Sequence, residues 1–187
     1  MSLERELVKE LRYRVAVESA ERARRWEVAI PGVALQSTID AAERDLGFSI
    51  HPDLVELYTK VANGGFGPEY YLLGIGENGH PSDQKRTAED EYHQFRNPDS
   101  ESPSWFWPGR VLPIHHWGCA IYTCIDCDSE EGVLYRFDPN AVDDDWSIAW
   151  LVEGRTLDQW LRAWLDDEDL FECDQPFWTE ARNRAVR

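Results

Sequence analysis

The chain has 187 residues and carries 36 acidic against 19 basic side chains, a formal net charge of -17. This balance argues against direct binding of nucleic acid, because phosphate contacts require clustered lysines and arginines, and it favours a basic partner. No stretch is long and apolar enough to cross a membrane, and the first residues are charged where a signal peptide would be apolar. We therefore expect a globular protein of the cytoplasm.

The N-terminal residues 3–26 are predicted to form a charged helix. Leu7, Leu11 and Val15 recur at four-residue intervals, and charged residues fill many of the other positions. Such a pattern buries one narrow side of a helix. Packing against the core is the interpretation that we favour, and a partner arm or an oligomer contact fits the same pattern.

Two further helices are predicted between residues 37 and 61. The first begins with an N-cap at Ser37 and stops at Gly47. The second has Pro52 at its first position and ends before the Asn-Gly-Gly sequence at 63–65. Their apolar positions are Ile39, Ala42 and Leu46 in the first helix and Leu54, Leu57, Tyr58 and Val61 in the second.

The middle of the chain has a mixed pattern. Residues 69–76 (EYYLLGIG) predict a short strand, because aromatic and branched residues run for a few positions before glycines. A helix is predicted within residues 87–96. Trp105, Phe106 and Trp107 follow in a polar, proline-containing segment, and we interpret them as a lid over the core, with an exposed anchor for a partner as the alternative.

The second half of the chain predicts an antiparallel sheet followed by a helix. Thr156 is a good N-cap for that helix, and a short basic helix or tail is expected at residues 176–187. A turn containing acidic residues and Gly132 joins the second and third strands into a hairpin. The strands are predicted at residues 111–114, 119–126, 132–138 and 147–152.

Two histidines and three cysteines gather between residues 115 and 127 and raise the question of a zinc site. They are His115, His116, Cys119, Cys124 and Cys127. In a continuous strand, Cys119 and Cys124 would point to opposite faces of the sheet, and no second Cys-x-x-Cys pair is present. We therefore predict no metal and no cofactor, and interpret the cysteines as reduced core residues.

Sequence motifs of catalysis are absent from the chain, including the nucleophile elbow, the zinc-protease motif and the phosphate-binding loops. Histidines without such a motif are more typical of structural residues. We therefore predict that the protein is not an enzyme. A catalytic or metal protein that uses His115, His116, Cys124 and Cys127 is the minority hypothesis.

Three segments, taken in order, resemble one family. Residues 39–65 (IDAAERDLGFSIHPDLVELYTKVANGG) resemble the opening motif of the SUKH superfamily, which includes fungal cell-wall-assembly regulators and many bacterial toxin-immunity proteins. Residues 118–140 (GCAIYTCIDCDSEEGVLYRFDPN) are similar to its hairpin, and residues 154–167 (GRTLDQWLRAWLDD) to its closing helix. The chain departs from the family pattern at His51, where leucine usually precedes the proline, and at Thr156, where serine is usual.

The resemblance implies an α+β fold, in which a single domain has a mainly antiparallel β-sheet flanked by helices. The extra N-terminal helix is an addition to that pattern. We accordingly divide the chain into an N-terminal helical extension (1–26), a SUKH-like domain (27–175) and a short C-terminal helix or tail (176–187). The family offers no catalytic residues to carry over.

For bacterial members the resemblance implies binding and neutralisation of a cognate toxin, often a nuclease. A nuclease tends to be basic, and an acidic protein can occupy its cleft. We predict a non-enzymatic immunity-type protein that binds a basic, nuclease-like toxin domain. The alternative is a regulatory scaffold that binds a cellular protein, as in cell-wall-assembly regulators; the oligomeric state is left open. The residues predicted to contact the partner are Asp126, Asp128, Glu130, Glu131, Asp143, Asp144, Asp145, Trp105 and Trp107.

Overall fold

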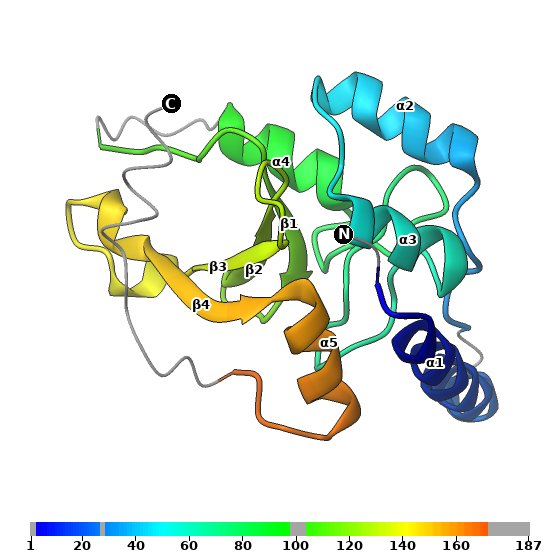
Figure 1. Ribbon diagram of the computed structural model, residues 1–187. Helices are drawn as coiled ribbons and strands as arrows, with labels where there is room; N and C mark the ends of the chain where they lie inside the picture. The colour runs from blue at the N-terminus through cyan, green and yellow to red at the C-terminus, as the bar shows by residue number, and fades with distance from the viewer. Residues whose placement is uncertain (1–2, 27–28, 98–103, 172–187) are drawn as a thin grey trace.

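The computed structural model describes residues 3–26, 29–97 and 104–171, and Figure 1 shows the arrangement of its helices and strands. The four strands form one antiparallel sheet in the order β1-β2-β3-β4. The predicted α+β fold with an added N-terminal helix is confirmed. The elements are α1 (Arg5–Trp26), α2 (Gln36–Leu46), α3 (Pro52–Lys60), α4 (Ala88–Arg96), β1 (Val111–His116), β2 (Tyr122–Asp126), β3 (Val133–Phe137), β4 (Trp150–Thr156) and α5 (Leu157–Leu165), with short 3-10 helices at Pro139–Ala141 and Trp146–Ala149.

Helices pack against both faces of the sheet (Figure 1). Neighbouring residues of a strand point to opposite faces, so each strand contributes to two packed layers. On one face, Tyr122 and Phe137 contact Phe95 of α4, with ring centroids 5.2 and 5.8 Å apart. On the other face, His115 contacts Trp160 of α5 at 5.5 Å. Because both faces are covered, the hairpin strands are buried along nearly their whole length.

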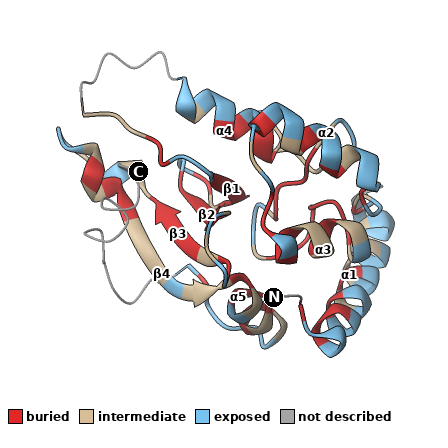
Figure 2. Cartoon of the chain, turned by 45° about the horizontal axis from the view of Figure 1, so that its top comes forward, coloured by how far each residue is buried: buried red, intermediate tan, exposed pale blue. Residues whose placement is uncertain are grey.

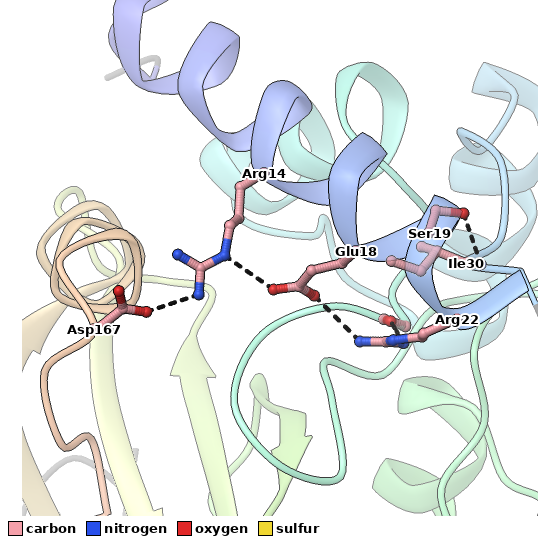
Figure 3. Close-up of polar contacts among 7 residues, drawn as sticks. Arg14, Glu18, Ser19, Arg22, Ile30 and Asp167 are labelled. Atoms are coloured by element: carbon pink, nitrogen blue, oxygen red, sulfur yellow. Dashed lines mark hydrogen bonds and ion pairs between the residues drawn. The ribbon is translucent and has the colours of Figure 1, made fainter. Parts of the chain in front are cut away.

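Helix α1 packs against α3 and α5 with one side, while its outer side is exposed (Figure 2). Leu7 and Leu11 are fully buried, which agrees with the packing interpretation of this helix. Polar contacts continue along the same side of the helix (Figure 3): Arg14 donates to Asp167, which follows α5, at 2.7 Å and to Glu18 at 3.1 Å. No helix in the described part of the chain is long and apolar enough to span a membrane.

The ends of α2 and α3 follow their predicted signals, with one correction. Gly47 ends α2 with a left-handed φ of 77°, and Pro52 occupies the first turn of α3. The predicted N-cap at Ser37 is wrong, because α2 starts earlier. The amides of Thr38 and Ile39 donate to the Leu35 carbonyl at 2.9 and 3.3 Å, so Leu35 is the N-cap and Ser37 lies in the first turn.

The strand predicted at residues 69–76 is wrong. Only Leu72 forms a ladder contact, an isolated antiparallel bridge to His115. Tyr70 and Tyr71 have left-handed φ values of 67° and 63°, which no extended strand allows. Leu72, Leu73 and Ile75 are instead buried in an irregular loop, whereas Tyr70 is exposed. The pattern therefore predicted burial only for the aliphatic residues, and it predicted the wrong conformation.

Two predicted strands begin later than expected. The strand predicted from residue 119 begins at Tyr122, because Cys119 and Ala120 form a turn with left-handed φ values of 49° and 59°. The strand predicted from residue 147 begins at Trp150, after a 3-10 helix capped by the Asp145 carboxylate. The remaining strands, the helix within residues 87–96 and the one that follows Thr156 are present. The helix or tail predicted at residues 176–187 lies outside the described residues.

A buried ion pair crosses the strands on the α5 side of the sheet. Arg136 of β3 and Glu153 of β4 are 3.2 Å apart, and their side chains are only 5% and 3% exposed. Thr123 donates a further hydrogen bond to Glu153, and Arg136 donates to the Leu170 carbonyl at 2.8 Å. Burial raises the pKa of Glu153, against the opposing effect of Arg136. The pair therefore ties the sheet to the segment that follows α5.

Candidate partner-binding site

A hollow of about 790 Å³ lies beside the turn between β2 and β3. All four acidic residues predicted there line it. Its lining also includes Arg110, Val111, Val133 and Tyr135. We call residues 126–131 the acidic turn. Its carboxylates are Asp126, Asp128, Glu130 and Glu131.

The acidic turn is held in shape by its own side chains. The Asp126 carboxylate accepts from the Asp128 amide at 3.0 Å, and the Ser129 hydroxyl donates to the Asp126 carbonyl at 3.0 Å. The Val133 amide in turn donates to the Ser129 hydroxyl at 2.9 Å. Asp126 is consequently buried, while Asp128, Glu130 and Glu131 are exposed. Three of the four carboxylates can therefore meet a partner directly.

Arg110 forms the opposite wall of the hollow and was not among the predicted site residues. Its guanidinium donates to Asp128 at 2.8 Å in an exposed ion pair, and its carbonyl accepts from the Cys127 amide at 2.9 Å. The antiparallel register pairs Val111 with Asp126, so the residue before β1 lies beside the residues after β2. Correct pairing of β1 with β2 in this register would have been enough to predict that Arg110 lies beside the acidic turn.

His51 supports the acidic turn from behind and was also missed, although it departs from the family pattern. It is the N-cap of α3, it is 1% exposed, and its Nδ1 accepts from the Asp53 amide at 3.2 Å. Burial lowers the pKa of His51, so the ring is neutral at neutral pH. The departure from the family pattern at His51 was the sequence signal that could have pointed to this contact.

The structure does not bring Asp143, Asp144 and Asp145 into the hollow. They are exposed and lie beyond the far end of β3, about 16 Å away for a five-residue strand. The Asp145 carboxylate accepts from the Ser147 amide at 2.9 Å, and the Asp144 carbonyl accepts from the Ser104 hydroxyl at 2.6 Å. The predicted acidic contacts thus form two separate groups.

The aromatic residues predicted as partner anchors pack into the core. Trp107 is 3% exposed, stacks on Phe95 at 4.3 Å and donates its indole N–H to the Val111 carbonyl at 2.9 Å. Trp105 is half-buried, contacts Trp146 at 4.5 Å and donates to the Phe95 carbonyl at 3.0 Å. Both rings cover the sheet as a lid. With its indole and ring face occupied, Trp107 offers a partner almost no surface.

The histidines and cysteines of the central segment do not converge on one point. Within the described residues, no group of three or more His, Cys, Asp and Glu side chains is placed to hold a metal ion. Cys119 is exposed in its turn, while Cys124 is buried in β2. Burial raises the pKa of Cys124 well above its usual range and that of Cys127 to about 12, so both thiols stay protonated at neutral pH. Protonated thiols are poor nucleophiles and poor metal ligands.

The fold is a single α+β domain with an acidic hollow beside the turn between β2 and β3. A model of the SMI1 / KNR4 family (SUKH-1) matches residues 34–163, which is more than half of the chain. The chain therefore belongs to this family, in agreement with the resemblance in its sequence. A search of curated proteins found no significant match.

Proposed function

We propose that this protein is an immunity-type binding protein of the cytoplasm, which neutralises a cognate toxin domain with a basic, nuclease-like surface. Membership of the SUKH-1 family supports an immunity-type or a regulatory role that needs no catalysis. The observation that carries the proposal is the hollow, which is lined by four carboxylates, three of them exposed. The net charge of -17 also favours a positively charged partner.

The hollow suits the long basic side chains of such a partner. Lysine and arginine combine an apolar stem with a charged head. Val133, which is partly exposed, offers contact to the stem, and the exposed carboxylates of Asp128 and Glu130 offer charge-assisted hydrogen bonds to the head. Charge complementarity also speeds the encounter between the two proteins.

The residues Asp143, Asp144 and Asp145 form a second proposed contact. They lie beyond the other end of β3, so a toxin domain that touches both groups would have to span the length of this strand. Trp105 and Trp107 are left out of the proposed direct contacts because Trp107 is buried and Trp105 is half-buried against Trp146. Their proposed role is to support β1 and Arg110.

The test is a pull-down from the source cell's lysate with the full chain as bait, at low and at moderate salt, with mass spectrometry of the bound proteins. The first variant carries Asp128→Lys, Glu130→Lys and Glu131→Lys. The matched control changes the charge equally by lysine substitutions of three exposed acids on the helices α1 and α2. These control positions are Glu10, Glu21 and Asp40.

We expect the wild-type chain and the control to retain a basic toxin domain, with less retained as salt rises. The association rate of the captured domain is then measured with each chain, and the turn variant should associate about tenfold more slowly. Equal association rates for the turn variant and the control would refute the hollow as the binding site. Reversal of Asp143, Asp144 and Asp145 tests the second contact in the same way. Capture of only envelope-synthesis or housekeeping proteins would favour the regulatory scaffold instead.

A further inference from the structure

His51 connects two parts of the molecule that are far apart in sequence. On one side it caps α3 through the Asp53 amide, and the Leu54 and Val55 amides both donate to its carbonyl at 3.0 Å. On the other side its ring lies against Gly132, the residue that ends the acidic turn and begins the return to β3. The side chain therefore sits between the start of a helix and the proposed binding turn.

The contact with Gly132 leaves little room for a larger residue. A Cβ atom placed there would lie 3.1 Å from Cε1 of His51, and the φ of +67° already disfavours any other residue. The Gly132 carbonyl also accepts from the Leu157 amide at 2.9 Å, at the first residue of α5. Gly132 therefore links the His51 ring to the first residue of α5.

The imidazole also interacts with the backbone of the turn itself. Its Nδ1 accepts a hydrogen bond, so in the neutral ring the proton must reside on Nε2. The backbone of Ser129 and Glu130 raises the pKa of His51 and so partly opposes the lowering caused by burial. Leucine, the residue usual at this place in the family pattern, would fill the space without either polar contact.

We infer that His51 is a positioning residue that holds the acidic turn against α3 and so fixes the direction of its exposed carboxylates. The role of this contact in partner binding rests on the proposed function, whereas the contact itself is present without a partner. Fixed carboxylates lose less conformational entropy on binding, which favours recognition by a rigid partner. His51 acts through Asp128 and Glu130 and touches no partner itself.

Two variants separate the turn contact from the helix cap. His51→Asn retains a side-chain oxygen that caps α3, but it is too short to replace the imidazole against Gly132. His51→Leu removes both polar contacts. Amide hydrogen exchange by NMR reports on each part: Cys127, Asp128 and Ser129 for the turn, and Asp53 and Val55 for the helix.

We expect His51→Asn to speed exchange of the turn amides about five- to tenfold, while the α3 amides and the melting temperature stay near the wild type. His51→Leu should speed exchange in both parts. Unchanged turn amides in His51→Asn, with α3 intact, would overturn the inference and leave His51 as a helix cap alone. A failure of the proposed function would give a different result from a failure of this inference. In that case the turn amides would still exchange faster in His51→Asn, but lysines at positions 128, 130 and 131 would leave partner binding unaltered.

Discussion

Replacing His115 by phenylalanine should remove a pH-dependent component of the folding free energy. His115 is fully buried between Trp117 and Trp160, with ring centroids 4.3 and 5.5 Å away. The pKa of His115 is lowered to about 3. Burial is the main cause, and the nearby positive charge of Arg136 contributes to the same shift. Phenylalanine fills a similar volume without a titratable group.

The sign follows from proton binding. In the unfolded chain the pKa of this histidine returns to about 6.5, so the unfolded state binds more protons than the folded one at every pH between the two values. Stability from this group is therefore complete above pH 6.5 and falls as the pH falls toward the folded pKa. The limiting slope is about 1.4 kcal/mol per pH unit, which gives a loss of about 2 kcal/mol between pH 7.5 and pH 5.

The assay is urea unfolding followed by tryptophan fluorescence at several pH values from 7.5 to 5. The free energy of unfolding of His115→Phe should fall less than that of the wild type over this range, by about 2 kcal/mol. Trp117→Phe serves as the control, because it changes the same aromatic stack and leaves the histidine in place. Parallel curves for the wild type and His115→Phe would refute the reasoning.

Two further predictions concern the buried ion pair and the cysteines. Arg136→Met should lower the free energy of unfolding by about 3–5 kcal/mol, because Glu153 is left buried without its partner. Arg110→Met should change it little, since that ion pair is exposed, and equal effects in urea unfolding would contradict this contrast. Protein purified without a tag should contain far less than one zinc per chain by elemental analysis. Stoichiometric zinc that survives dialysis would contradict the interpretation of Cys124 and Cys127 as core thiols.

Local chemistry explains which parts of the fold were predictable from the sequence. Gly47 permits the left-handed residue that ends α2, and Thr156 forms a capping box with Gln159, so both signals act within one turn of a helix. Tyr70 and Cys119 show the limit, because both have left-handed conformations in turns. Nothing in the residue types themselves indicates these conformations.

The candidate site divides in the same way. The acidic turn could be predicted because its carboxylates are neighbours in sequence, and a short turn keeps neighbours together. Arg110 and His51 reach the turn through strand register and helix packing, which require the tertiary structure. The separation of Asp143 from the turn depends on β3, since residues on either side of a strand lie at its opposite ends.

The position of α1 bears on where the folding unit of this protein begins. The family match starts at residue 34, after α1 has ended, yet Leu7, Leu11 and Val15 lie in the same apolar core as α3 and α5. A fragment limited to residues 34–163 would expose that side of the core to water and would lose the anchor between Arg14 and Asp167. We expect such a fragment to aggregate or to unfold readily. In this protein, the apolar core therefore extends beyond the family match at both ends, to α1 on one side and to Trp164 and Leu170 on the other.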